Sequence, residues 1–185
     1  ERTDVLTSFP ATALAATLNH KELDYSESKN LPPLWHWLYF LPIFRLSEAG
    51  YDGHAALGDF LPPVPLPRRM WAGSRIKFLL PLKLGNEYKK TSTIKSVSAK
   101  SGRSGNLVFV TVTHEVSSDG SICINEEHDI VYREKATSSS APAKLVEAPK
   151  EFDFSSDINP DPVLLFRYSA LTFNGHRIHY DHPFC

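Results

Sequence analysis

The sequence predicts an α+β fold whose larger part is an antiparallel sheet, and three observations carry this prediction. Residues 9–22 read as a short helix, because a proline suits the first turn and Ala and Leu favour the helix interior. Residues 106–116 and 122–134 are rich in β-branched and aromatic side chains, which favour strands. Asp119-Gly120 lies between them and is a hairpin signal, so we expect these two strands to pair antiparallel.

The composition is that of an ordinary globular protein. The chain has 185 residues, of which 42% are hydrophobic and 22% are charged, and its formal net charge is −1. Without a basic excess we expect no nucleic acid and no anionic membrane as partner, although a local cluster could bind an anionic small molecule. No apolar run reaches the roughly 18 residues that a spanning helix needs. The two cysteines show neither metal-ligand spacing nor a disulfide framework, and no secretory signal is visible, so we expect an intracellular protein.

A stretch rich in prolines and aromatic residues, residues 31–71, separates the helix from the strands. Its part "DFLPPVPLPRRMW" is excluded from a central strand or a helix interior, because each proline lacks a backbone donor. We therefore expect an ordered, extended loop that covers apolar surface. We expect Trp35 and Trp37 to pack in the core or an interface rather than to touch a ligand.

The rest of the first domain is predicted to be a meander of at least four strands. The first, residues 73–85, places four apolar residues on one face: Ile76, Phe78, Leu80 and Leu82. Gly85-Asn86 is a turn, and residues 87–100 are long and polar, as in an exposed strand. A second turn, residues 101–106, leads into the two strands already described.

The composition changes after the meander. Residues 136–150 are mostly Ala, Ser and Pro with little to bury, which predicts a linker between a first domain, 1–135, and the start of a second, 151–185. Val163 to Leu171 is predicted to be an apolar strand that runs into "NGHRIHYD". A lone strand cannot bury both faces, so we expect the second domain to be truncated or to rely on a partner.

Three interpretations of this histidine-rich segment compete. His179-x-Asp181 could supply two ligands of a 2-His-1-carboxylate iron site, with His114 or His128 as the third. Alternatively, His179 could move protons while a polar group five residues earlier, Asn174, positions water for addition to the double bond of a thioester. In the third interpretation the segment is a solvated loop whose histidines pair with Asp181.

The terminal segment "YSALTFNGHRIHYDHPFC" resembles a variant of the hydratase motif of the MaoC-like hotdog hydratases and dehydratases. In the common motif an Asp lies five residues before the His of H-x-D-x-x-x-small. The matching positions here are Asn174, His179, Asp181 and Cys185. The segments "LPPLWHWLYFLP", "GDFLPPVPLPRRMWAGSRIKF", "SGRSGNLVFVTVTHE" and "HDIVYRE" resemble the N-terminal half of double-hotdog members, so the resemblance covers nearly the whole chain.

The resemblance implies a hotdog fold, an antiparallel sheet wrapped around a helix, with one half and the start of the second in this chain. It implies a hydro-lyase that acts on an acyl-thioester, such as mesaconyl-CoA, itaconyl-CoA or a 3-hydroxyacyl thioester. It further implies no dissociable cofactor or metal, a homodimer, and a mitochondrial or cytoplasmic location. The resemblance also implies a helix after the motif, whose N-terminal amides serve the oxyanion in the family, and we expect this helix beyond Cys185.

Asn174 departs from the family pattern, because an amide does not take up a proton at neutral pH. The resemblance then implies that Asn174 orients water, that His179 is the base, and that Asp181 orients His179 or carries the second proton. The alternative is a non-catalytic domain that binds acyl-CoA.

Residue chemistry suggests candidates for substrate binding. Arg69 could contact CoA phosphates or a substrate carboxylate, since arginine binds both in a bidentate manner, or it could be a surface charge beside a strand. Arg68 is interpreted as a surface charge. Arg177 could bind a substrate carboxylate or form a loop salt bridge with Asp181. His176 and Trp71 are the other two candidates.

Overall fold

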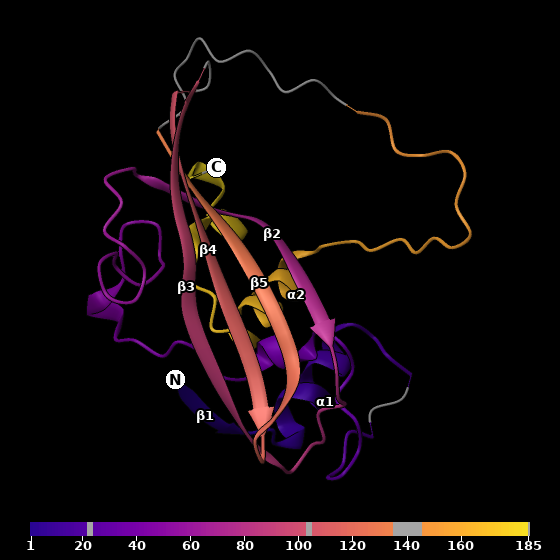
Figure 1. Cartoon of the computed structure of the whole chain (residues 1–185). Coiled ribbons are helices and arrows are strands. Elements are labelled where there is room, and N and C mark those ends of the chain that lie inside the picture. Colours follow the sequence, from indigo (N-terminus) through magenta and orange to yellow (C-terminus); the bar gives the residue numbers. More distant parts are fainter. Residues whose placement is uncertain (22–23, 103–104, 135–145, 185) are drawn as a thin grey trace.

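The computed structural model describes residues 1–21, 24–102, 105–134 and 146–184. A five-stranded sheet dominates it, with the order β1-β3-β4-β5-β2 and only antiparallel neighbours (Figure 1). The strands are β1 (Arg2–Val5), β2 (Arg68–Phe78), β3 (Glu87–Gly102), β4 (Gly105–Ser118) and β5 (Ser121–Arg133). Strands β3, β4 and β5 form a meander as predicted, but the predicted first strand of the meander, β2, pairs with β5 and not with β3. The place beside β3 is taken by β1, which was not predicted.

The hairpin between β4 and β5 has the conformation that its sequence favours. Asp119 and Gly120 both have positive φ, 48° and 76°, as a two-residue type I′ turn requires. Gly85 also has a positive φ, 87°, at the predicted turn before β3. The predicted turn 101–106 lies partly outside the described residues.

Within the described residues the α-helices are α1 (Ser8–Thr17) and α2 (Pro162–Leu171), and they lie on the same side of the sheet (Figure 1). The same part of the chain contains the short 3-10 turns η1 (Trp35–Leu38), η2 (Leu46–Glu48), η3 (Arg177–His179) and η4 (His182–Phe184). The predicted helix 9–22 is too long, because α1 ends at Thr17 and Asn19 already has a φ of 56°.

The prediction of a strand from Val163 to Leu171 is wrong, because this segment is helix α2. Local capping decides the matter. The Asp161 carboxylate accepts the backbone N–H of Leu164 at 2.9 Å, and Pro162 occupies the first turn, where its missing N–H costs nothing. Leu171 at the end of α2 lies against the main core, whereas Val163, Leu165, Phe166 and Tyr168 are exposed.

The main core fills the space between α1 and the sheet. It joins side chains of α1, of the aromatic stretch and of the strands, among them Ala11, Leu14, Leu38, Phe40, Tyr88, Val116 and Ile124. Trp35 packs against this core, as predicted. An antiparallel sheet wrapped around a helix is the predicted hotdog arrangement.

A second cluster lies under the proline-rich loop. Val64 is buried against Val110, Ile130 and Tyr132, with Leu61 and Leu66 packed on the same cluster. The prediction that this loop covers apolar surface is thus confirmed. The predicted strand 73–85 is partly wrong, because β2 ends at Phe78; beyond it the chain is irregular and Leu80 is 47% exposed.

A buried carboxylate interrupts the apolar face of β5. Glu126 is 3% exposed, and its Oε2 lies 3.2 Å from Nε2 of His36 and accepts the indole N–H of Trp37 at 3.2 Å. Ser74 donates to the other oxygen at 3.4 Å. Burial alone raises the pKa of Glu126, but the hydrogen bonds from His36 and Trp37 outweigh it and lower the pKa to about 2.

We expect Glu126→Ala to lower the free energy of unfolding by about 2–4 kcal/mol, because buried donors lose their acceptor. Because the folded pKa is depressed, the carboxylate stabilises the fold above its ordinary pKa of 4.5, and this contribution is lost as the pH falls towards about 2. Urea unfolding between these pH values should show a weaker pH dependence in the variant. The exposed Glu87→Ala is the control, and equal stability of the two variants would contradict the prediction.

The segment between β5 and α2 contains no helix or strand where it is described. Residues 146–160 are exposed, and Figure 1 shows them in a wide loop beside the sheet that returns to α2. Much of the predicted linker, residues 136–145, lies outside the described residues, so the division into 1–135, 136–150 and 151–185 stays a prediction. No helix in the described parts is long and apolar enough to cross a membrane.

Candidate active site

The residues of the predicted motif, 174–181, form a compact loop after α2, the motif loop. The Asn174 side-chain oxygen accepts the backbone N–H of His176 at 3.1 Å, which turns the chain directly after the helix. The 3-10 turn η3 follows and is closed by the N–H of His179 on the carbonyl of His176 at 3.1 Å. Asn174 thus shapes the loop that presents His179, whose side chain is exposed.

A second loop, residues 50–54, holds the motif loop. The N–H of Arg177 donates to the carbonyl of Asp52 at 2.9 Å. Gly53 has a φ of +87°, and a Cβ on it would overlap the carbonyl of Gly175. Glycine is needed here both for the backbone conformation and for the close approach of the two chains.

Arg177 fastens the motif loop. Its Nε and Nη2 donate to Oδ2 of Asp181 at 2.8 and 2.5 Å, and its Nη1 donates to the carbonyl of Tyr51 at 3.1 Å. The guanidinium also lies over the ring of Phe184, 4.8 Å from its centroid. The sequence suggested two roles for Arg177, binding a substrate carboxylate or forming a salt bridge with Asp181. The structure contains the salt bridge.

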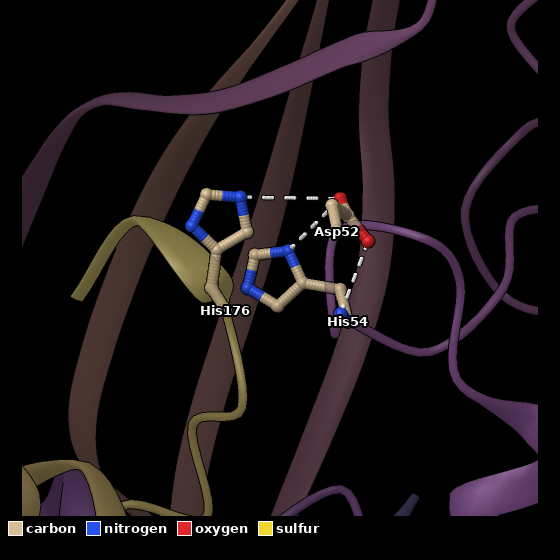
Figure 2. Close-up of side chains that lie close together, drawn as sticks. All are labelled: Asp52, His54 and His176. Atoms are coloured by element: carbon tan, nitrogen blue, oxygen red, sulfur yellow. Dashed lines mark hydrogen bonds and ion pairs between the residues drawn. The ribbon is translucent and has the colours of Figure 1, made fainter. Parts of the chain in front are cut away.

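Two histidines and a carboxylate meet where the loops touch, as Figure 2 shows. The rings of His54 and His176 are stacked with centroids 4.4 Å apart. Oδ2 of Asp52 lies 3.6 Å from Nδ1 of His54 and 4.0 Å from Nε2 of His176. These three side chains form a group of ligand atoms that could hold a metal ion.

Both histidines of this group are held neutral. Burial, Arg69 and His176 lower the pKa of His54 to about 4, although Asp52 opposes them. Burial also lowers the pKa of His176. At neutral pH both rings therefore keep a nitrogen lone pair that can accept a proton, a hydrogen bond or a metal ion.

The structure brings together most of the predicted site residues. Asn174, His176, Arg177, His179 and Asp181 share the motif loop, with the rings of His176 and His179 5.9 Å apart. Arg69 acts electrostatically on His54 and His176 and donates to the carbonyl of Ala55 at 3.4 Å.

Other predicted residues lie apart from this loop. Trp71 on β2 is 64% exposed, and its indole N–H donates to Ser74. Cys185 lies outside the described residues. The predicted iron site combined His179 and Asp181 with His114 or His128. Within the described residues, the side chains close enough to hold a metal ion are instead Asp52, His54 and His176.

Sequence reasoning missed Asp52, Gly53 and His54. The sequence offers one local indication of this loop, the turn-forming pair Asp52-Gly53 followed by a histidine. It lies inside the stretch that the sequence predicts to be a covering loop. Nothing in that stretch indicates its partner, because the motif loop lies more than a hundred residues later in the sequence.

A family model described as hydroxyacyl-thioester dehydratase type 2 matches residues 34–185. The chain belongs to this family. This type 2 dehydratase family member is 48% identical over 174 residues to the mesaconyl-C(4)-CoA hydratase of Chloroflexus aurantiacus, covering 94% of this chain and 62% of that protein. It is 27% identical to the mitochondrial hydroxyacyl-thioester dehydratase type 2 of Schizosaccharomyces pombe, covering 96% of this chain and 68% of that protein.

Solved structures confirm the hotdog fold of this type 2 dehydratase family member. HtdX of Mycobacterium tuberculosis matches with a TM-score of 0.59 at 12% identity, over 98% of this chain and 65% of that one. A MaoC-like dehydratase of Phytophthora capsici matches with a TM-score of 0.58 at 17% identity, over 98% and 63%. The chain thus spans less than two thirds of the Chloroflexus hydratase and of both solved structures.

Gly53→Ala should release the motif loop from the loop 50–54. We expect the Arg177 amide, which donates to Asp52, to exchange its hydrogen at least about tenfold faster, equivalent to about 1.4 kcal/mol of local stability. Gly120→Ala is the matched control, because Gly120 also has a positive φ but its Cβ would meet nothing within 4 Å. Amide hydrogen exchange measures the effect. An unchanged Arg177 amide in Gly53→Ala would contradict the role of this contact.

Proposed function

We propose that the whole protein is a hydro-lyase that adds water to, or removes it from, the double bond next to an acyl-thioester carbonyl. The observation that carries the proposal is the motif loop with Asn174, His179 and Asp181, in a chain 48% identical to a mesaconyl-C(4)-CoA hydratase. The proposed substrate is a short acyl-CoA such as mesaconyl-CoA or itaconyl-CoA, or a 3-hydroxyacyl thioester.

The reaction needs three kinds of catalytic group: a base, an acid and hydrogen-bond donors for the thioester oxygen. In the hydration direction a base takes a proton from water, the water oxygen bonds to the β-carbon, and the α-carbon receives a proton. Donors must also stabilise the enolate-like thioester oxygen. We assign the base to His179, since imidazole both takes and gives a proton near neutral pH.

Asn174 and Asp181 are assigned supporting roles in this mechanism. The side-chain oxygen of Asn174 already accepts the N–H of His176. We therefore assign its side-chain NH2 group to orient the water molecule. Asp181 accepts two hydrogen bonds from Arg177, which favours a role in orienting the loop around His179 over a role as second proton carrier. Arg69, His176, Arg177 and Trp71 remain the proposed substrate contacts.

We also propose that β2 is the edge along which a second hotdog pairs, as in a homodimer. β2 is the last strand of the sheet order, so its outer backbone groups have no neighbouring strand within the described sheet. Along it, Met70 is 47%, Trp71 64% and Phe78 46% exposed. An apolar, unpaired edge strand is a ready template for pairing with another sheet.

The proposed location is intracellular, mitochondrial or cytoplasmic. An acyl-CoA substrate supports an intracellular place. The two kinds of relative point to different compartments, because the yeast proteins are named as mitochondrial whereas the Chloroflexus hydratase is bacterial.

His179→Ala in the full-length protein should lower kcat/KM for mesaconyl-CoA hydration by about 100- to 10,000-fold, the usual contribution of a general acid–base group. The loss of the conjugated thioester absorbance measures the rate. His182→Ala is the matched control, because this exposed histidine lies three residues further along the chain. Equal rates in the two variants would remove the role given to His179. Binding of acyl-CoA by the wild type without turnover of any proposed substrate would instead establish the non-catalytic alternative.

Asn174→Asp should retain activity, with an altered rate or pH profile. A carboxylate at this position can still accept the N–H of His176 and so preserve the loop, and it can take up a proton as in the common motif. The same assay across pH measures the change, and circular dichroism checks the fold. Complete loss of activity in a folded Asn174→Asp protein would mean that the amide itself is required.

A further inference from the structure

The geometry points to a metal-binding site formed by Asp52, His54 and His176, for a first-row divalent cation such as Zn²⁺. One ligand atom from each side chain lies within 4.8 Å of the other two. Figure 2 shows both imidazoles turning a nitrogen towards the carboxylate of Asp52. These are not the residues of the His179–Asp181 pair, and the inference does not depend on the proposed hydro-lyase activity.

The distances fit an ion better than direct hydrogen bonds. Oδ2 of Asp52 is 3.6 Å from Nδ1 of His54 and 4.0 Å from Nε2 of His176. A hydrogen bond to oxygen would bring each nitrogen to about 2.7–3.2 Å. Around tetrahedral Zn²⁺, with metal–ligand bonds of about 2.0–2.2 Å, neighbouring ligand atoms lie about 3.3–3.6 Å apart. The distance from Oδ2 to Nδ1 of His54 matches this spacing, the distance to Nε2 of His176 is longer, and all three ligand atoms lie within 4.8 Å of one another. Because the two rings are stacked, one of them must rotate for both lone pairs to point at the ion.

The state of the donor atoms supports a metal ion in this place. Nδ1 of His54 is buried and has no hydrogen-bond partner among the described residues, although a buried ring nitrogen normally has one. A metal ion would satisfy it. Two imidazoles and one carboxylate select Zn²⁺ and similar ions over Ca²⁺ and Mg²⁺, which prefer oxygen ligands.

The surroundings hold the ligands in position. The backbone N–H of His54 donates to Oδ1 of Asp52 at 3.1 Å, which leaves Oδ2 facing the two rings. The N–H of Arg177 holds the carbonyl of Asp52, and so fixes the loop with His176 against the loop with His54. Such outer hydrogen bonds orient ligands at known metal sites.

The charge of Arg69 works against a cation at this place, since it already disfavours protonation of His54 and His176. The carboxylate of Asp52 offsets this repulsion. Three protein ligands leave one position for water. A bound ion would join the loop 50–54 to the motif loop through metal–ligand bonds, three residues before His179.

The experiment uses the untagged full-length protein, stripped with EDTA and titrated with Zn²⁺ by calorimetry, with bound zinc measured by mass spectrometry. We expect one Zn²⁺ per chain at this site and at least tenfold weaker binding in His54→Ala and in His176→Ala. Cobalt(II), titrated in place of zinc, should give the visible absorption of a four-coordinate site with nitrogen and oxygen ligands.

The control is His182→Ala, which removes a histidine from the same part of the chain and should bind Zn²⁺ as the wild type does. Asp52→Asn keeps the shape of the side chain and its bond to the N–H of His54, so it decides the matter if an alanine variant fails to fold. Failure of the wild type to bind Zn²⁺, equally tight binding by Asp52→Asn or the histidine variants, or displacement by equimolar Ca²⁺ would overturn the proposal. Hydratase activity enters none of these readouts.

Discussion

The candidate site depends on a contact between two backbones, where Gly53 meets Gly175. Neither of these two backbone segments has room for a side chain at this point, since a Cβ on Gly175 would lie 2.9 Å from the carbonyl oxygen of Gly53. The hydrogen bonds of Arg177 to Asp52 and Tyr51 follow from this approach, as does the stacking of His54 on His176. The motif loop is thus held by the loop 50–54 and not by its own sequence alone.

Much of the fold could be predicted because its signals are local. The hairpin at Asp119 and Gly120 needs positive φ at both positions, and the sequence places there a pair of residues that tolerate it. The segment 163–171 was mistaken because its apolar run outweighed the capping signals of Asp161 and Pro162. In a short segment, a capped first turn predicts the element better than the number of apolar residues.

The site was only half predictable. Asn174, His179 and Asp181 lie within eight residues of one another and share a recognisable spacing, whereas the loop 50–54 joins them only through the tertiary fold. Glu126 was missed for a different reason. It occupies a buried position between Ile124 and Ile130, where strand alternation predicts an apolar residue, and its partners His36 and Trp37 come from a distant turn.

The long separation between the two loops also has a consequence during biosynthesis. Because a chain grows from its N-terminus, Asp52 and His54 leave the ribosome well before Gly175 and His176 do. At about 5–20 residues per second, roughly 120 further residues take on the order of 6–24 s to make. During that interval the sheet can form before the loop 50–54 has the motif loop to contact. Assembly of the motif loop is therefore a late event, set by chain length and not by the folding speed of the sheet.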